Sequence, residues 1–333
     1  MLKVTAPGKV LWIGSYSVLY GGTSHVIAIN RRVKAIGQKN DSIVEIVSNF
    51  GKYKFNPSEL DHVGNSVIRE TVKACFEVVG DKFGFSAKLL NHEDFQVNGR
   101  KTGIGSSSAS TVALASLIVL LAKGELDLET IHKCSQISNY RRQGGVGSGF
   151  DIACSVYGTI EYERFRRESI EKGIIDSKIT PLPLPKGVEI ILGITNRSSD
   201  TVNLVSKFEQ HKEEKRFLDA ISEIDNHNRK AINYLKKGEV EDAIVEVEEG
   251  RKTLKSLSKS IGVLLESEEE ERIIKEAKSL GALTSFSHGA GGDSILALGW
   301  DLNKVRKRWR EMGIKVLEVE QETIGVKVEG CSC

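Results

Sequence analysis

A glycine- and serine-rich segment, Lys101–Ser110, has the residue types that fit phosphate chemistry best. It reads Lys-Thr-Gly-Ile-Gly-Ser-Ser-Ser-Ala-Ser and runs into the apolar stretch 111–122. Two glycines let the backbone turn tightly and approach a ligand closely. If the apolar stretch is a helix, its start presents unpaired N–H groups and the positive end of the helix dipole. Serine hydroxyls there can bond phosphate oxygens or Mg²⁺. We expect a phosphate site; the alternative is a serine-capped helix without a ligand.

Two common nucleotide sites are excluded at this segment. No Gly-Lys-Ser/Thr ends it, so it is not a P-loop of the mononucleotide-binding type. Its glycine spacing does not fit a dinucleotide fingerprint, and no acidic residue follows about 20 positions later.

Asp151 is the best candidate for an acid–base group. It follows the flexible segment Gln143-Gly-Gly-Val-Gly-Ser-Gly-Phe and stands where a helix begins. It is either a helix cap or a base that accepts a proton from a phosphoryl acceptor. Lys9 is its natural partner, because a nearby cation keeps a carboxylate ionised and stabilises charge on a moving phosphoryl group. The alternative for Lys9 is a surface lysine at the end of a strand.

Composition limits the class of protein. A chain of 333 residues exceeds what one hydrophobic core usually serves, so two domains are expected. The net charge of +2 implies no long-range basic field, which argues against nucleic acid as a partner. No apolar run reaches the roughly 18 residues of a membrane span, and the N-terminus has no signal-peptide pattern. We therefore expect a cytoplasmic protein with no membrane partner. The sequence does not choose between a monomer and a homodimer.

Pattern and proline content divide the chain. Thr180–Lys186 holds three of the five prolines and is interpreted as the linker between domains 1–182 and 183–333. Helices are expected over Thr111–Ala122 and over Leu128–Tyr140, the latter with Asp127 as its cap. In the second half, the pattern predicts two antiparallel helices over 206–258 and a closing hairpin of Lys315–Val319 with Thr323–Val328. We therefore expect this half to be an antiparallel α+β unit.

Three motifs resemble those of the GHMP kinase superfamily, in its order and at its spacing. Ala6-Pro-Gly-Lys-Val-Leu-Trp-Ile-Gly14 with Tyr16-Ser-Val-Leu-Tyr-Gly21 resembles the first motif. Gly103-Ile-Gly-Ser-Ser-Ser-Ala109 resembles the second, and Ser287-His-Gly-Ala-Gly-Gly-Asp293 the third. The resemblance covers nearly the whole chain. It implies an N-terminal α/β domain and a C-terminal ferredoxin-like α+β domain, with the active site between them.

The resemblance also implies roles for single residues. Lys9 and Asp151 become the catalytic pair, and Ser107 the ligand of Mg²⁺. The implied contacts to ATP are Lys101, Gly103, Gly105, Ser106, Ser107 and Ser108. The implied contacts to the acceptor are Tyr16, Arg141, Arg142, Ser148, Gly149, Arg197, Ser198, Ser199, Thr201, Gly289, Ala290 and Gly291. Arginine at these places suits a carboxylate or phosphate, since its planar fork binds both in a bidentate way.

The stretch Gln143–Phe165 resembles the phosphomevalonate kinases of the eukaryotic type, which show Q-G-x-x-G-S-G-F-D followed by Y-G-x-x-x-Y-x-R-F. This implies that ATP and (R)-5-phosphomevalonate are converted to ADP and 5-diphosphomevalonate. Mevalonate kinase or another kinase of the superfamily, diphosphomevalonate decarboxylase, and an ATP-binding sensor without activity remain alternatives. The sequence departs from the family pattern in its third motif, where His288 replaces a small residue or proline and Ser294 stands where cysteine is common.

Some residues keep two interpretations. Arg141 and Arg142 either meet the acceptor or form a solvated helix end. His288 is either catalytic or a loop histidine near phosphate. Glu93 and Asp94 are either Mg²⁺ ligands or ordinary loop carboxylates. Cys331 and Cys333 either bind a soft metal or belong to a frayed tail.

Overall fold

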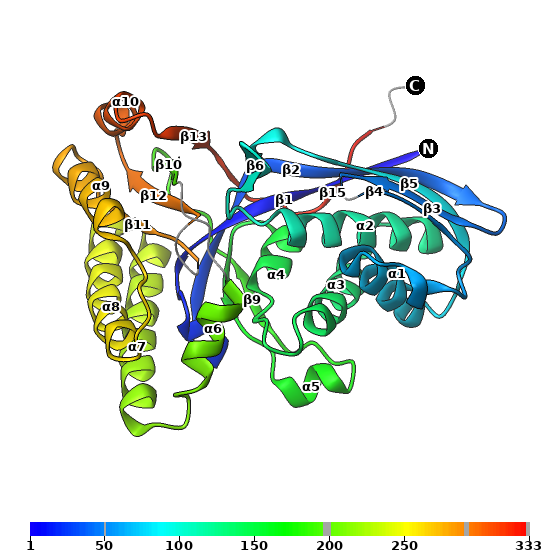
Figure 1. Ribbon diagram of the computed structural model, residues 1–333, viewed down its shortest axis with the longest axis horizontal. Coiled ribbons are helices and arrows are strands. Elements are labelled where there is room, and N and C mark those ends of the chain that lie inside the picture. The colour runs from blue at the N-terminus through cyan, green and yellow to red at the C-terminus, as the bar shows by residue number, and fades with distance from the viewer. Residues whose placement is uncertain (50, 196–200, 290–292, 331–333) are drawn as a thin grey trace.

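Two β-sheets, each with its own helices, make up the protein (Figure 1). The computed structural model describes residues 1–49, 51–195, 201–289 and 293–330, with the backbone alone for residues 201–203. The predicted Arg197, Ser198, Ser199, Ala290, Gly291, Cys331 and Cys333 lie outside the described residues, and the side chain of Thr201 is not described.

The larger sheet belongs mainly to the first half of the chain. Its strands are β1 (Leu2–Ile13), β2 (Ser24–Asn40), β3 (Val44–Ser48), β4 (Gly51–Phe55), β5 (Gly84–Asn91), β8 (Ile160–Glu163), β9 (Lys178–Pro181), β14 (Gln321–Glu322) and β15 (Lys327–Val328). The main order is β15-β1-β2-β5-β3-β4, and β8 and β14 also pair with the long β2. A small separate hairpin of β6 (Gln96–Val97) and β7 (Arg100–Lys101) leads into the glycine- and serine-rich segment.

Helices cover one face of this sheet (Figure 1). They are α1 (Ser66–Val79), α2 (Ser106–Lys123), α3 (Leu128–Arg142) and α4 (Phe150–Tyr157), with the short η1 (Ser17–Tyr20), η2 (Leu60–His62), η3 (Glu93–Phe95) and α5 (Arg167–Glu171) in the connections. Asp127 caps α3 as predicted, and its carboxylate accepts from the Thr130 N–H at 3.0 Å.

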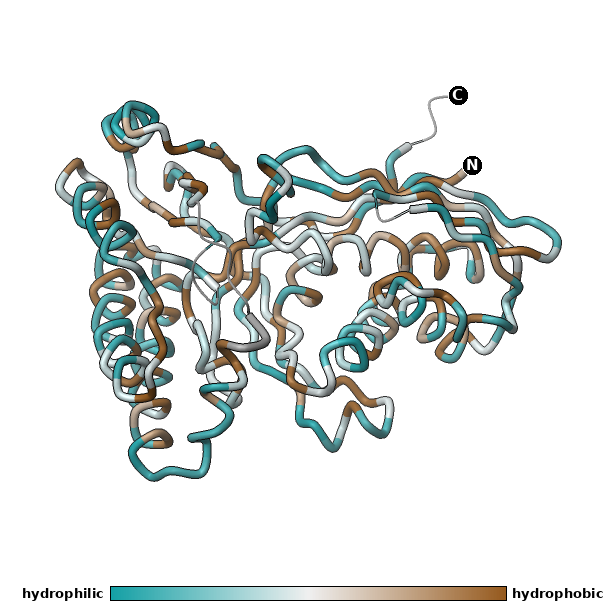
Figure 2. The backbone as a smooth tube through the Cα atoms, viewed as in Figure 1, coloured by the Kyte–Doolittle hydropathy of each residue, from teal (hydrophilic) through white to brown (hydrophobic). Residues whose placement is uncertain are grey.

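Helix α2 is the buried centre of this half. It begins at Ser106 rather than at the predicted Thr111, so the three serines form its first turn. The helix is apolar along most of its length (Figure 2). Within the described residues it is long and apolar enough to cross a membrane, but 72% of it is buried inside the protein, as in a core helix.

The smaller sheet is a four-stranded antiparallel sheet in the order β11-β12-β10-β13. Its strands are β10 (Glu189–Ile194), β11 (Thr284–Ser287), β12 (Ser294–Gly299) and β13 (Lys315–Val319), and its helices are α6 (Thr201–Glu209), α7 (Lys215–Lys237), α8 (Val240–Ser260), α9 (Glu268–Ser279) and α10 (Asn303–Glu311). The first and third strands of the unit, β10 and β12, lie at the centre of the sheet and the second and fourth, β11 and β13, lie at its edges, which is the ferredoxin-like arrangement. The predicted fold class, an α/β part followed by a ferredoxin-like part, is confirmed.

Two details differ from the sequence-based predictions. The expected pair of helices over 206–258 exists as α7 and α8, but the separate α6 precedes them. The predicted hairpin of Lys315–Val319 with Thr323–Val328 is wrong. Strand β13 pairs with β10 in the smaller sheet, whereas β14 and β15 pair with β2 and β1 in the larger one. The last strands are very short, so they carry no alternation from which their partner could be inferred.

The predicted linker is tied to the larger sheet rather than free. The buried His25 ring bonds the Leu182 carbonyl through Nε2 at 2.6 Å, and Gln321 donates to the Leu184 carbonyl at 2.8 Å. Burial lowers the pKa of His25 to about 4, so the ring is neutral at physiological pH. The domain boundary at 182/183 stays a prediction, and the return of β14 and β15 shows that the chain crosses between the two sheets a second time.

Candidate active site

A cavity of about 730 Å³ lies where the two sheets meet. The first two motifs, the segment before Asp151, α6 and the β11–β12 turn all contribute to its wall. Among its lining residues are the predicted Lys9, Tyr16, Lys101, Gly103, Gly105, Ser106, Ser107, Ser108, Arg142, Ser148, Asp151 and Gly289. The structure therefore brings together most of the described residues that the sequence singled out.

The start of α2 forms one side of the cavity. Gly105 precedes the helix with φ +87°, a left-handed conformation that favours glycine, and no side chain caps the helix there. A Cβ on Gly105 would approach Lys9 Cγ to 3.0 Å and Ser108 Oγ to 3.1 Å. Ser108 itself is buried and donates to the Gly105 carbonyl at 2.9 Å. The uncapped helix start with the Ser106 and Ser107 hydroxyls in the wall fits an anion such as phosphate.

Strand β1 packs directly against the segment that leads into α2. Gly8 has no side chain where the Ile104 carbonyl passes, since a Cβ would come within 2.6 Å of that oxygen. The next residue, Lys9, donates its backbone N–H to the Ile104 carbonyl at 2.8 Å. The glycine in the first motif thus allows the second motif to lie directly against the strand.

Lys9 of β1 also lines the cavity. The side chain is buried, and Nζ donates to the Gly103 carbonyl at 2.9 Å. Burial lowers the pKa of Lys9, and the negative charges of Asp151 and Asp293 partly oppose that shift. The electrostatic link between Lys9 and Asp151 is the one expected from the sequence.

Asp151 stands in the first turn of α4 but does not cap it. The cap position is taken by Gly149, at φ +75°, and the Asp151 carboxylate accepts from the next backbone N–H, that of Ile152, at 3.0 Å. Gly149 is not among the lining residues, although Ser148 and Phe150 on either side of it are, and its contact with the acceptor stays a prediction. It is glycine because a Cβ would come within 2.1 Å of Gln136 Oε1.

The segment that carries Asp151 is held by side chains from outside it. Gln136 donates to the Gly149 carbonyl at 2.9 Å, and Tyr162 donates to the Ser148 carbonyl at 2.6 Å. Arg164 donates to the Gly147 and Leu19 carbonyls, both at 2.8 Å. Because three buried or half-buried donors fix its carbonyls, this glycine-rich segment has a defined shape despite its composition.

The two consecutive arginines have different places. Arg142 lines the cavity, donates to Asn139 at 2.6 Å and lies close enough to Asp151 for the two charges to interact. Arg141 pairs with Glu77 of α1 at 2.7 Å and is not part of the cavity wall. The predicted contact of Arg141 with the acceptor is therefore wrong, because neighbouring residues of a helix point in different directions.

Helix α6 contributes a further part of the cavity wall. Tyr16 has φ 61°, unusual for a residue other than glycine, and its ring stacks on Phe208 of α6 with centroids 4.0 Å apart. Val205, Ser206 and Glu209 of the same helix line the cavity. Tyr16 thus joins the first motif to the smaller-sheet half of the protein.

Sequence reasoning missed several residues of the wall, notably Asp293, Glu209, Gln143 and Phe150. Asp293 ends the third motif and could have been found from its position there. Glu209 had no signal, since it is one of many glutamates on a charged helix. Asp94 is paired with Arg31 at 2.6 Å, which favours its interpretation as a structural loop carboxylate.

The acidic side chains that line the cavity are Asp151, Glu209 and Asp293. Within the described residues, no group of three or more His, Cys, Asp or Glu side chains could hold a metal ion. Mg²⁺ usually keeps phosphate oxygens and waters and takes one or two ligands from the protein.

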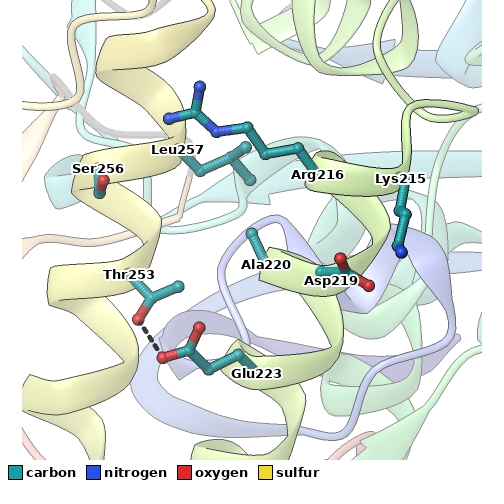
Figure 3. A pocket seen from close by; sticks show the side chains of 8 residues that line it. All are labelled: Lys215, Arg216, Asp219, Ala220, Glu223, Thr253, Ser256 and Leu257. Atoms are coloured by element: carbon teal, nitrogen blue, oxygen red, sulfur yellow. Dashed lines mark hydrogen bonds between the residues drawn. The ribbon is translucent and has the colours of Figure 1, made fainter.

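A second hollow, of about 620 Å³, lies between α7 and α8 (Figure 3). Its charged residues include both signs, Lys215 and Arg216 with Asp219 and Glu223. Glu223 is already hydrogen-bonded to Thr253 at 3.1 Å (Figure 3). These residues do not converge on a ligand position, and the cavity between the sheets remains the candidate active site.

Fold and cavity together define a small-molecule kinase of the GHMP class, and the family described as GHMP kinases N terminal domain matches residues 69–159. Over 335 aligned residues the sequence is 42% identical to the phosphomevalonate kinase of Saccharolobus solfataricus, with 99% of each chain covered. The chain belongs to the phosphomevalonate kinase family.

More distant proteins share the fold. The structure of Streptococcus pneumoniae phosphomevalonate kinase in complex with phosphomevalonate and AMPPNP superposes with a TM-score of 0.81 at 22% identity, over 97% of this chain and all of that one. The mevalonate kinase of Pyrococcus horikoshii is 25% identical, over 88% of this chain and 86% of its own. The similarity to the Saccharolobus enzyme is thus considerably higher than that to this mevalonate kinase.

Proposed function

We propose that this protein transfers the γ-phosphoryl group of ATP to the phosphate of (R)-5-phosphomevalonate, which gives ADP and 5-diphosphomevalonate in the mevalonate route to isoprenoids. The observation that carries this is the full-length 42% identity to a phosphomevalonate kinase. The cavity supports it, because a phosphate-binding helix start, a buried lysine and a carboxylate line the same space. A coupled ADP-release assay over phosphomevalonate, mevalonate, homoserine and galactose tests it.

The start of α2 would hold the ATP phosphates. Its uncapped N–H groups and the Ser106 and Ser107 hydroxyls face the cavity, and Lys101 adds a positive charge at the rim. Ser107 would be the protein's ligand to Mg²⁺. The ion neutralises charge on the transferring phosphoryl group.

Other residues of the wall would hold the acceptor. Phosphomevalonate carries a carboxylate and a phosphate, and Arg142 is a cation in the wall that can meet such a group, while Lys101 at the rim can reach toward the acceptor as well as ATP. Ser148, Tyr16 and Gly289 lie in the same wall and would complete the acceptor site. In the reaction an oxygen of the acceptor phosphate forms a bond to the γ-phosphorus while the bond to the β–γ bridging oxygen breaks.

Lys9 and Asp151 would act at the point of transfer. Lys9 would stabilise negative charge on the phosphoryl group as it moves between the two phosphates. Asp151 would take the remaining proton of the acceptor phosphate when that group is a monoanion and would keep Lys9 positively charged. A sensor without activity would not require this pair.

Replacing Ser107 by alanine is expected to weaken the use of Mg·ATP. The hydroxyl is the proposed metal ligand, so the Mg²⁺ concentration that gives half-maximal activity should rise severalfold. Titrating MgCl₂ at fixed ATP measures this. Ser110→Ala is the control, because Ser110 lies one turn further along α2 and is buried away from the cavity. An unchanged Mg²⁺ dependence of the Ser107 variant would remove it as the ligand.

Replacing Arg142 by alanine is expected to raise KM for phosphomevalonate at least about tenfold, since a charge-assisted hydrogen bond contributes about 1.5–3 kcal/mol. KM for ATP should change little. Arg141→Ala is the matched control, because Arg141 pairs with Glu77 outside the cavity. Equal effects of the two variants on KM for phosphomevalonate would contradict the assignment.

The predictions of a cytoplasmic location and of a monomer or homodimer stay predictions. Size-exclusion chromatography with light scattering determines the second. The decarboxylase alternative is separated from the proposed kinase by its product, because a decarboxylase consumes diphosphomevalonate and releases CO₂.

A further inference from the structure

A chain of buried hydrogen bonds joins the third motif to the glycine- and serine-rich segment Lys101–Ser110, which we call the phosphate loop. Ser294, the first residue of β12, donates its hydroxyl to the Thr102 carbonyl at 3.0 Å. His288, just after β11, bonds the same hydroxyl through Nε2 at 2.8 Å. All three residues are buried. One serine hydroxyl therefore connects both ends of the β11–β12 turn with a residue of the larger-sheet half.

The direction of these bonds defines the state of the histidine. A carbonyl can only accept, so the Ser294 hydroxyl donates to Thr102 and must accept from His288 Nε2–H. Burial, together with the nearby Lys9 ammonium, lowers the pKa of His288 to about 3. The ring is thus neutral and donates at Nε2, which leaves it unsuited to act as an acid or base in the reaction near neutral pH.

Thr102 directly precedes the two residues whose carbonyls hold Lys9. The next carbonyl, that of Gly103, accepts from the Lys9 ammonium at 2.9 Å, and the following one, that of Ile104, accepts from the Lys9 backbone N–H at 2.8 Å. A shift of the Thr102 carbonyl would therefore move the atoms that hold Lys9.

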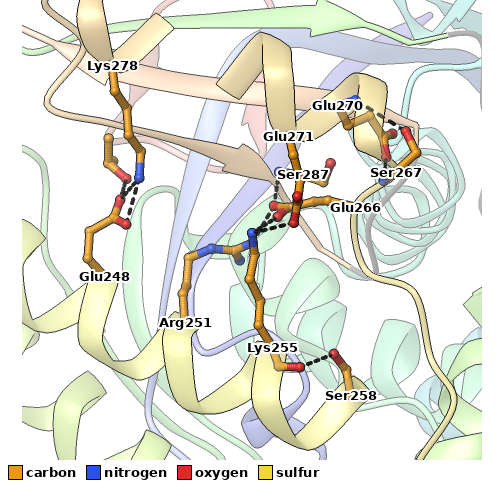
Figure 4. Close-up of polar contacts among 11 residues, drawn as sticks. Glu248, Arg251, Lys255, Ser258, Glu266, Ser267, Glu270, Glu271, Lys278 and Ser287 are labelled. Carbon is orange, nitrogen blue, oxygen red and sulfur yellow. Dashed lines mark hydrogen bonds and ion pairs between the residues drawn. The ribbon is translucent and has the colours of Figure 1, made fainter. Parts of the chain in front are cut away.

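The strand before the turn is anchored by an ion cluster around the buried Glu266 (Figure 4). Glu266 accepts from the Ser287 backbone N–H at 3.0 Å, from Arg251 at 2.6 Å, and pairs with Lys255 at 2.5 Å. The Arg251 guanidinium also lies 4.0 Å from the centre of the Phe286 ring. These contacts hold the residues just before His288 in place, so the position of the histidine relative to Ser294 is defined.

We propose that His288 and Ser294 form a clamp that positions the phosphate loop and, through it, Lys9. The two residues flank the β11–β12 turn on its two sides, and they are hydrogen-bonded to each other. The clamp is a pair of positioning residues, since neither is required to touch the reacting atoms. The role in catalysis rests on the proposed function, whereas the coupling between the two residues does not.

A double-mutant cycle tests the clamp. His288→Ala and Ser294→Ala should each lower kcat between about tenfold and a hundredfold, because small displacements of catalytic groups have effects of this size. The double variant should be no worse than the more damaged single variant, since either change breaks the same connection. His288→Gln should restore most of kcat, because its amide N–H can replace the ring Nε2–H, a rescue that a loss of packing alone would not show.

Ser285→Ala is the control, because Ser285 is a buried residue of β11 whose hydroxyl has no hydrogen-bond partner within the described residues. Its kcat should match that of the unaltered protein. The same cycle is measured on the free energy of unfolding in urea, which needs no substrate. If the effects of the two alanine changes simply add, both in kcat and in the free energy of unfolding, the clamp is contradicted. This holds even if the enzyme phosphorylates phosphomevalonate. Coupling in unfolding with an inactive enzyme would instead overturn the proposed function.

Discussion

Replacing Asp151 by asparagine is expected to lower kcat at least about a hundredfold at pH 6, with KM for ATP little changed. A positioned acid–base group contributes about 10²–10⁴-fold. Asparagine keeps the size of the side chain and the acceptor for the Ile152 N–H, so the fold of α4 should persist. Steady-state kinetics with phosphomevalonate as the varied substrate measures the effect.

The pH dependence of this loss separates the two contributions of Asp151. A phosphate monoester loses its second proton near pH 6. At pH 8 the acceptor has already lost that proton, so the defect of Asp151→Asn should be smaller than at pH 6. The part that remains at pH 8 reports the effect of the carboxylate on Lys9.

Asp127→Asn is the control for a purely structural role. Asp127 also stands at a helix start, where it caps α3 and pairs with Lys123 at 2.6 Å, away from the cavity. This change should leave kcat unaltered. If Asp151→Asn behaved in the same way, Asp151 would have no part in the reaction.

Replacing Lys9 by methionine should lower kcat by about a hundredfold to a thousandfold, the range found when one preorganised group that stabilises transition-state charge is removed. Methionine retains most of the length of the side chain. The free energy of unfolding should be unchanged or larger, because burial of the ammonium costs solvation energy that methionine does not lose. Loss of activity without loss of stability distinguishes a catalytic lysine from a structural one.

The pH profile gives a second test of Lys9. Burial lowers the pKa of Lys9, so the required cation is present at low pH and is lost as pH rises, at a lower pH than for an ordinary lysine. In Asp151→Asn one of the opposing negative charges is gone, so the alkaline decline in kcat should move to still lower pH. A decline at the same pH in both proteins would contradict the electrostatic link.

Much of the candidate site follows from the sequence because its motifs consist of residues with special backbone or charge requirements. Gly105 needs a left-handed conformation, Ser106–Ser108 start a helix, and Lys9 is a cation in an apolar strand. These are properties of single residues and of short segments. The resemblance then supplied what local pattern cannot, namely that three distant segments meet at one cavity.

The errors concern directions and long-range partners. Arg141 and Arg142 are alike in sequence, and only the position of α1 with Glu77 shows which of them faces outward. The return of β15 to β1 depends on a pairing between residues more than 300 positions apart, of which two-residue strands give no sign. The connection of His288 to Thr102 is likewise a tertiary contact, although both departures from the family pattern were visible in the sequence.

Phosphorus NMR of one incubation tests the central claim most directly. The purified protein is mixed with Mg·ATP and (R)-5-phosphomevalonate, and the spectrum is followed over time. The account predicts that the phosphomonoester signal disappears while the two coupled signals of a diphosphate ester and those of ADP grow in equal amounts. A phosphomonoester that persists, in a protein that phosphorylates mevalonate under the same conditions, would contradict the account.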